Sequence, residues 1–210
     1  MKYTSVLAKA KKTVIPFPVI VFFATISAFW AMGPAFAHHP MDARDVQTFS
    51  SIEGLISGLG HPIIGTDHLF FLLSIGLVSS LSIKRFLPLL LFSGFTGTLT
   101  SLYFPDLING VEIVVGLSLC VATLVCYGFL NPLFILPLIF CHGYVLGETI
   151  IGAEPTPLIS YCLGLIISQT ILILLSLGLF RYFLKYQLIM KNILFVIAIV
   201  FALRTLIVFV

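Results

Sequence analysis

Charged side chains are scarce in this sequence. Lys, Arg, Asp and Glu together make up 9% of its 210 residues, whereas soluble domains carry about 25%. Hydrophobic residues make up 60%, and the mean hydropathy is +1.17. This composition excludes a soluble enzyme and predicts a membrane protein.

Basic residues only slightly outnumber acidic ones. Eleven Lys and Arg against eight acids give a net charge of +3. Four of the lysines (Lys2, Lys9, Lys11 and Lys12) precede the first apolar stretch. The rest of the chain is close to neutral, so the electrostatic footprint of a nucleic-acid partner is missing. The sequence also lacks a Walker A loop and a flavin fingerprint, which excludes a nucleotide-hydrolysing domain.

Cysteine is limited to four residues, and none of them forms a C-x-x-C pair. All four fall inside apolar stretches, where a thiol is first of all a packing group: Cys120, Cys126, Cys141 and Cys162.

The N-terminus has the pattern of a secretory signal. Lysines come first, an apolar stretch follows from Val14 to Met32, and small residues precede Ala37 as in an A-x-A cleavage site. We expect residues 1–37 to be a signal peptide. The alternative is a retained first helix, because about 19 apolar residues are enough to span a bilayer.

Cleavage after Ala37 would make His38 the first residue of the mature chain. Its free α-amine and the imidazoles of His38 and His39 could chelate a divalent metal, since neutral imidazole is a common ligand. A solvated histidine pair is an equally good interpretation.

The rest of the sequence, from residue 38 onward, predicts an all-α membrane protein with six transmembrane helices. Residues 38–64 form an extracytoplasmic N-terminal segment, whose part from Asp42 to Gly60 is more polar and suits a short amphipathic surface helix. Residues 65–210 form a six-helix transmembrane domain. The predicted spans are Gly65–Ser82, Phe86–Phe104, Val111–Leu130, Pro132–Ile151, Leu158–Phe180 and Leu188–Val210.

Basic residues between these spans set the orientation, because cytoplasmic loops retain Lys and Arg. Lys84 and Arg85 follow the first span, and Arg181, Lys185 and Lys191 surround the turn before the last one. Both groups are cytoplasmic if the mature N-terminus is outside. We therefore expect a multi-pass protein of the inner (cytoplasmic) membrane with its mature N-terminus outside.

Under this orientation the histidines and acids gather toward the outer side. Pro62 suits the first position of a helix, which places His61 at its mouth and Asp67 and His68 within its first two turns. Seven residues make two turns, so His61 and His68 share one face, with His68 about 10 Å deeper. The alternative is a structural Asp67–His68 pair.

Two further spans contribute polar groups at a similar depth. Glu112 lies near the outer end of the third span, and His142 lies about 9 Å below Glu148 in the fourth. A buried His142 bonded to a backbone carbonyl, and interfacial glutamates, are the alternatives for each residue alone. Taken together, imidazoles and carboxylates from three helices suit nickel, cobalt or zinc, because a hard-ion site would use oxygen ligands alone.

Two segments resemble the HupE/UreJ family of hydrogenase and urease accessory permeases. The segment from His61 to His68 matches its H-P-x-x-G-x-D-H signature, and the segment from His142 to Glu148 is similar to its H-G-x-A-H-G segment with the following glutamate. The resemblance implies transport of nickel or cobalt, with Glu112 as the acid of the third span. It also implies an aromatic residue on the path, which would be Phe92 or Phe95.

The sequence departs from the family at one position that affects which metal it would bind. Leu146 stands where the family has a second histidine, which leaves copper or zinc open and makes Cys141 a candidate softer ligand. The resemblance implies that His61, Asp67, His68, Glu112, His142 and Glu148 serve the metal path, with His38 and His39 possible at its entrance. No permanently bound cofactor is expected.

The leading hypothesis is a permease that brings the ion inward. A site that must release its ion should bind it through few ligands at a time. The main alternative is an intramembrane zinc-dependent hydrolase built on the same residues. Two further alternatives are a haem carrier with His68 and His142 as axial ligands and a purely structural membrane subunit.

Overall fold

The structure, a computed structural model, describes residues 50–78, 83–105, 107–151 and 155–209. The predicted signal peptide lies outside the described residues, as do His38 and His39. The predictions made for them therefore stay predictions.

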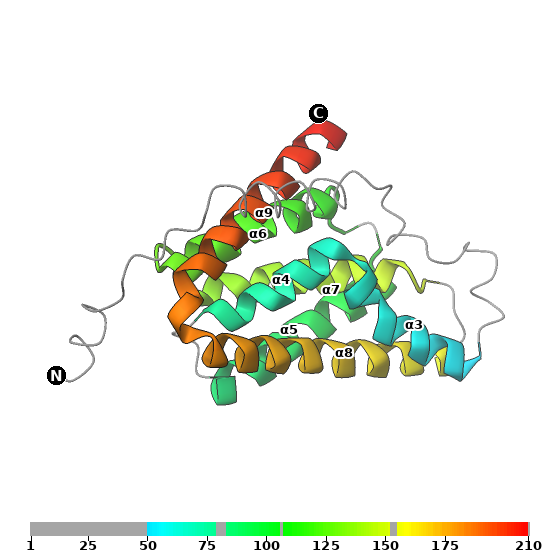
Figure 1. The fold of residues 1–210 in the computed structure, drawn as a ribbon. Helices are drawn as coiled ribbons and strands as arrows, with labels where there is room; N and C mark the ends of the chain where they lie inside the picture. Colours follow the sequence, from blue (N-terminus) through cyan, green and yellow to red (C-terminus); the bar gives the residue numbers. More distant parts are fainter. Residues whose placement is uncertain (1–49, 79–82, 106, 152–154, 210) are drawn as a thin grey trace.

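All regular structure in the described part of the chain is helical, which confirms an all-α fold (Figure 1). The helices of the first half are α3 (Ser51–Ile64), α4 (Thr66–Leu77), α5 (Ile83–Tyr103) and α6 (Val111–Tyr127). The second half contains η3 (Pro132–Phe134), α7 (Ile135–Glu148), α8 (Pro155–Tyr182), η4 (Leu184–Tyr186) and α9 (Gln187–Phe209).

Three stretches within the described residues are long and apolar enough to cross a membrane: Lys84–Tyr103, Pro155–Tyr182 and Leu184–Ile207. Three more are apolar but shorter: Thr66–Leu77, Val111–Tyr127 and Pro132–Glu148. Helix α6 is short because glycines in left-handed conformation, Gly110 (φ 73°) and Gly128 (φ 84°), bound it at both ends. The six-span arrangement stays a prediction.

Helix α3 begins with a capping box. The Glu53 amide donates to the Ser50 hydroxyl oxygen (3.3 Å), and the Ser50 amide donates back to the Glu53 carboxylate (2.8 Å). These hydrogen bonds hold the pKa of the exposed Glu53 carboxyl below its usual value of 4.5. The predicted surface helix from Asp42 to Gly60 overlaps α3 in its second half, and residues 42–49 lie outside the described residues. One face of α3 is not on the surface, because Gly54 and Gly58 are buried against α8.

The chain breaks between α3 and α4, which agrees with a first span that begins near Gly65 but corrects the predicted position of Pro62. Pro62 lies in the last turn of α3 instead of the first turn of a helix, and α4 begins only at Thr66. Gly65 joins them in an extended conformation (φ −68°, ψ 101°). His61 and His68 therefore do not lie on one continuous helical face, and the predicted depth difference between them does not apply.

Glycines allow the helices to approach backbone to backbone. A Cβ atom at Gly143 of α7 would overlap the Gly94 carbonyl of α5, and one at Gly97 of α5 would overlap the Phe140 carbonyl of α7. Such contacts through small residues are typical of membrane helices. Helices α3 and α8 meet in the same way through Gly58, which faces the Tyr161 backbone.

These contacts also give the directions of neighbouring helices. In α5 and α7, Gly94 lies opposite Gly143, and further along both helices Ser101 lies opposite Gly147. Residue numbers therefore increase in the same direction, and the two helices are parallel. Helix α3 runs parallel to α8, because Gly54 faces Pro157 and Gly58 faces Tyr161. Helix α4 continues in the same direction along α8: His68, near its start, lies next to His61, which contacts Tyr161, and Gly76, near its end, faces Ser176. Helix α9 is antiparallel to α6, because Gly116 faces Thr205 whereas Cys120, further along, bonds to the Ala198 carbonyl.

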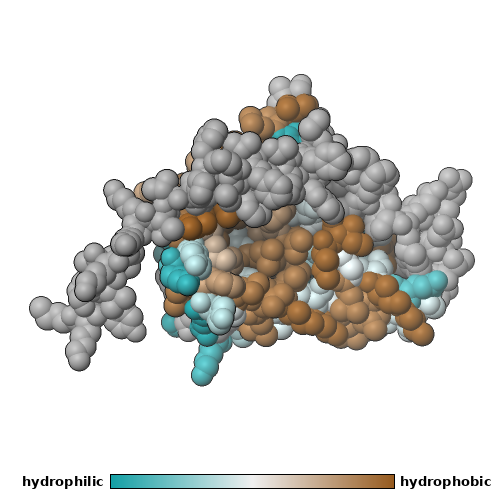
Figure 2. All heavy atoms as spheres, viewed as in Figure 1, coloured by the Kyte–Doolittle hydropathy of each residue, from teal (hydrophilic) through white to brown (hydrophobic). Residues whose placement is uncertain are grey.

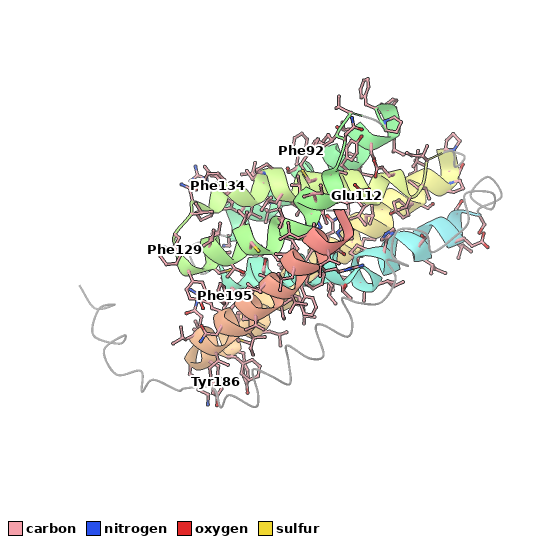
Figure 3. The ribbon with its side chains drawn as sticks, turned by 90° about the horizontal axis from the view of Figure 1, so that it is seen from above. Phe92, Glu112, Phe129, Phe134, Tyr186 and Phe195 are labelled. Carbon is pink, nitrogen blue, oxygen red and sulfur yellow. The ribbon has the colours of Figure 1, made fainter. Side chains whose placement is uncertain are left out.

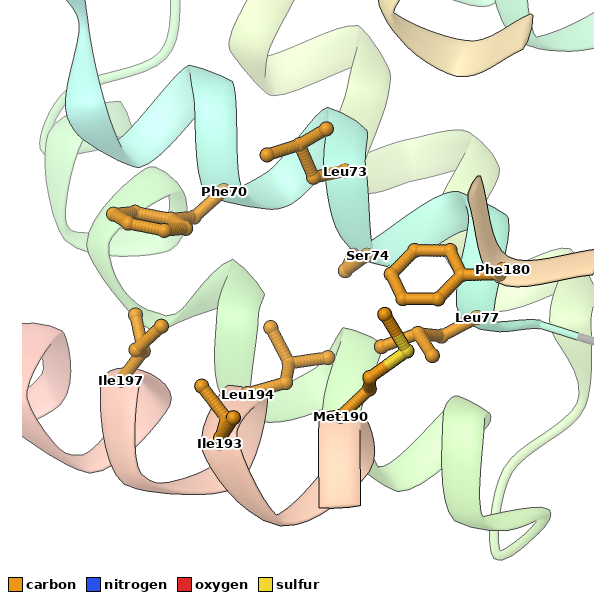
Figure 4. A pocket seen from close by; sticks show the side chains of 9 residues that line it. All are labelled: Phe70, Leu73, Ser74, Leu77, Phe180, Met190, Ile193, Leu194 and Ile197. Carbon is orange, nitrogen blue, oxygen red and sulfur yellow. The ribbon is translucent and has the colours of Figure 1, made fainter. Parts of the chain in front are cut away.

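Apolar side chains cover much of the outer surface, with hydrophilic residues gathered at the two ends of the view (Figure 2). An apolar groove of about 210 Å³ lies between α4, the end of α8 and α9 (Figure 4). Its single polar lining residue, Ser74, donates its hydroxyl hydrogen to the Phe71 carbonyl. The described surface thus suits an apolar surrounding along its length.

Candidate metal centre

Helix α4 brings the first part of the predicted site together directly after the Gly65 break. Asp67 lies in its first turn, half-buried, and its carboxylate accepts a hydrogen bond from the His68 amide (2.9 Å). A carboxylate is favoured there because the first amides of a helix carry partial positive charge. A Cβ atom at Gly65 would meet the His68 ring, so the glycine makes room for that imidazole.

The imidazoles of His68 and His142 face each other in the protein interior. Their Nδ1 atoms are 2.5 Å apart and their ring centroids 4.7 Å, and the side chains are only 1% and 3% exposed. Phe71, one turn after His68, stacks on the His142 ring at 4.1 Å. The structure therefore brings these two histidines of α4 and α7 together, with Phe71 packed against them.

Helix α6 adds a residue that sequence reasoning missed. The Ser118 hydroxyl lies 2.8 Å from Nε2 of His142, so the His142 ring has polar partners at both nitrogens. Ser118 is buried six residues after Glu112. A serine inside an apolar stretch is common, and nothing in its sequence context marks it as a neighbour of a histidine.

His61, at the end of α3, lies near His68 and contacts α8. Its ring centroid is 6.2 Å from that of His68, and its Nδ1 lies 3.2 Å from the Tyr161 hydroxyl of α8. Tyr161 also donates to the Leu146 carbonyl (2.7 Å) and contacts the Thr149 hydroxyl (3.1 Å). The sequence contained no signal for Tyr161, because its contact with His61 spans 100 residues.

The two glutamates lie at one end of a helical hairpin. Glu112 is in the first turn of α6, beside the end of α9 (Figure 3), and Glu148 is the last residue of α7. A short connection joins α6 to α7, so the two helices return on each other and both carboxylates lie at the same end. Both side chains are half-buried. The role of the two glutamates as ligands stays a prediction.

Within the described residues, no three His, Cys, Asp or Glu side chains form a group that could hold one ion together. The observed geometry is a contacting pair, His68 and His142, with His61 and Asp67 close by. A pair of imidazole nitrogens is a partial ligand set, which an ion completes with further groups or water.

Two other candidates are placed away from the pair. Phe92 is 67% exposed and points outward (Figure 3), so of the two alternatives for the aromatic residue on the path the half-buried Phe95 is favoured. Cys141 packs beside the Val111 and Val115 cluster. All four cysteines are free thiols, which fits their predicted role in packing.

The direct contact between His68 and His142 also disagrees with the haem alternative. Axial ligands need an iron atom and a porphyrin between them. Here the Nδ1 atoms touch, and the Phe71 ring covers one face of His142.

The fold and the site define a class: an all-helical membrane protein with imidazoles from three helices buried at its centre. Comparison with protein families identifies the family within this class. The chain belongs to the HupE / UreJ protein family, whose pattern it matches over residues 26–204. Neither the curated proteins nor the solved structures contain a match. The family supports a metal transport or accessory role in general terms, and nothing in the match supports the hydrolase.

Proposed function

We propose that the protein is a secondary permease that carries a divalent transition metal ion, nickel or cobalt, into the cell. The observation that carries the proposal is the buried Nδ1 to Nδ1 contact between His68 of α4 and His142 of α7. Ionisable side chains are costly within a membrane and usually serve an ion path or a ligand site. Imidazole nitrogens select borderline first-row ions over calcium or magnesium.

The remaining predicted residues fit the same path. Asp67 supplies a carboxylate beside the pair, and His61 lies 6.2 Å from His68 between ring centroids. Glu112 and Glu148 lie at one end of the α6–α7 hairpin, where they would attract a cation. His38 and His39 would concentrate metal at the entrance if the signal is cleaved after Ala37.

A small ligand set suits transport. An ion held by two imidazoles and a few exchanging groups binds less firmly than one in a closed four-ligand structural site. Conduction requires that the ion can leave as well as enter. The absence of a preformed group of three ligands in the described residues fits that requirement.

The orientation belongs to the proposal as well. We place six helices across the inner membrane with the mature N-terminus outside. Alternating crossings require α4 and α8 to be parallel, α5 and α7 to be parallel, and α6 and α9 to be antiparallel. The observed contacts between these helices have these directions. The start of α5 and the α8–α9 turn, which carry basic residues, lie at the same end of the molecule (Figure 1).

Metal accumulation in cells tests this function. Cells expressing the protein should accumulate nickel or cobalt above control cells when nickel, cobalt, copper and zinc are measured side by side. His68→Ala should abolish this accumulation. Thr123→Ala is the matched control, since Thr123 is also buried and its hydroxyl donates to the Leu119 carbonyl of its own helix. Unchanged uptake by His68→Ala, at normal protein level, would refute the proposal.

A further inference from the structure

Ser118 lies between two partners that together determine where its hydrogen goes. Its oxygen is 2.6 Å from the Val115 carbonyl oxygen and 2.8 Å from Nε2 of His142, and the side chain is 1% exposed. A carbonyl can only accept, so the single hydroxyl hydrogen of Ser118 goes to Val115. The serine oxygen must then accept from His142, which requires a hydrogen on Nε2. This is the only assignment that satisfies both contacts.

The assignment determines the state of the other ring nitrogen. A neutral imidazole that carries its hydrogen on Nε2 has a free lone pair on Nδ1. In His142 this Nδ1 faces Nδ1 of His68 at 2.5 Å. The hydrogen of that contact therefore belongs to His68. His142 acts as donor on the α6 side and as acceptor on the α4 side.

We propose that Ser118 is a positioning residue that holds His142 in the Nε2–H tautomer and so presents the Nδ1 lone pair to the transported ion. The inference rests on the proposed function and deepens it. Ser118 does not touch the ion. It acts through the imidazole, as outer hydrogen-bond partners of ligating histidines do in metal proteins.

The entering ion takes the place of the hydrogen between the two Nδ1 atoms. Two nitrogen–metal bonds form and the Nδ1–H bond of His68 breaks. The proton moves to the Nε2 lone pair of the same neutral ring, so the charge of the protein does not change. Nitrogens bound at about 2.0–2.1 Å to one ion lie about 3 Å apart. The rings therefore separate slightly as the ion binds, while the Ser118 contact and the Phe71 stack keep His142 in place.

The direct test reads the tautomer by NMR. Full-length protein labelled with ¹⁵N in its histidine rings is purified in detergent with a chelator, and His142→Gln assigns the His142 signals. The wild type should show the hydrogen on Nε2 of His142. Ser118→Ala should lose this preference, because a buried Nε2–H would have no acceptor. Ser118→Thr keeps a hydroxyl and should keep the tautomer.

Ser74→Ala is the matched control. Ser74 is equally buried and makes the same 2.6 Å bond to the carbonyl three residues earlier, that of Phe71. Among the described residues, no histidine is bonded to its hydroxyl. The Ser74→Ala variant should leave the His142 signals unchanged. Ser118→Cys, which keeps the volume with a poor acceptor, replaces the alanine variant if that variant does not fold.

Nickel accumulation completes the test. Loss of such a hydrogen-bond partner typically costs 10–100-fold in metal affinity or activity, so we expect at least a tenfold loss in Ser118→Ala, with rescue in Ser118→Thr. An unchanged tautomer in Ser118→Ala would overturn the inference, and so would wild-type accumulation in that variant. If the wild type itself accumulates no metal, the proposed function fails, and the NMR result still decides whether Ser118 sets the tautomer.

Discussion

Three imidazoles buried within one helix bundle must be uncharged or well paired, because an isolated charge in an apolar interior is very costly. His142 satisfies this condition through its contacts with His68 and Ser118, and His61 does so through Tyr161. The hydroxyl groups of a serine and a tyrosine are suited to this task. They can donate to a backbone carbonyl and accept from a ring nitrogen without adding charge.

Tyr161 gives a prediction at this scale. Tyr161→Phe removes the hydroxyl that contacts His61 and donates to Leu146, so we expect a stability loss of about 1 kcal/mol and reduced nickel or cobalt uptake. Tyr144→Phe is the matched control, because Tyr144 is also fully buried but its hydroxyl bonds to the backbone of Phe104 and Leu107. It should lose similar stability and keep uptake.

Thermal unfolding in detergent and metal accumulation in cells measure the two effects separately. Equal uptake by the two phenylalanine variants would mean that the Tyr161 hydroxyl does nothing for the metal path.

At the scale of elements, the site depends on how closely α5 and α7 approach. Gly94 and Gly143 bring the two backbones into direct contact, and His142 precedes that glycine by one residue. The Thr98 hydroxyl donates to the Gly143 carbonyl across the same interface (3.0 Å). The position of His142 is therefore determined by a contact between backbones, which a side chain at residue 143 would push apart.

Gly143→Ala tests this contact. Because the new methyl group would overlap the Gly94 carbonyl, we expect a loss of about 1–3 kcal/mol in stability, together with reduced uptake. Gly178→Ala is the control, since Gly178 of α8 has open space around it. The Gly178→Ala variant should keep its stability or gain about 0.5–1 kcal/mol, as expected for Ala over Gly in a helix. A Gly143→Ala variant as stable as the wild type would contradict the close packing of α5 and α7.

The break between α3 and α4 acts at the same scale. With Gly65 extended, α4 begins anew and His68 comes within 6.2 Å of His61 between ring centroids. A continuous helix would have separated them by about 10 Å along its axis. The break is therefore what brings the two halves of the H-P-x-x-G-x-D-H signature together.

At the scale of the whole molecule, three long apolar helices, α5, α8 and α9, pack with three shorter ones, of which α4 and α7 carry His68 and His142. Helices α4 and α7 each contribute a histidine to the central pair, and neither has the length of a full span by itself. Both are supported along their sides by longer helices: α4 by the parallel α8, and α7 by the parallel α5.

Labelling of exposed positions tests the orientation. We replace the four native cysteines and introduce one new cysteine at Tyr103, Phe129 or Tyr182, which are 77%, 75% and 81% exposed. In right-side-out spheroplasts, an impermeant maleimide should label Tyr103→Cys directly. It should label Phe129→Cys and Tyr182→Cys only after permeabilisation. The reverse pattern would place the basic turn outside and overturn the proposed direction.

The sequence by itself determined the class, the helical fold and the two motifs. Scarce charge and long apolar stretches are properties of composition, and they hold whatever the packing. The residues that meet at the centre, His61, Asp67, His68 and His142, were also named in advance, because polar groups inside apolar stretches stand out without any knowledge of contacts.

Only the tertiary structure decided which groups touch. Ser118 and Tyr161 contact histidines that lie 24 and 100 residues away, and such contacts leave no mark on local sequence. Phe92 and Phe95 were equivalent in the sequence, and only the rotation of α5 within the bundle turned Phe92 outward. The helix break at Gly65 was decided in the same way, because Pro62 fits the last turn of α3 as well as the first turn of a new helix, and packing against α8 selects the former.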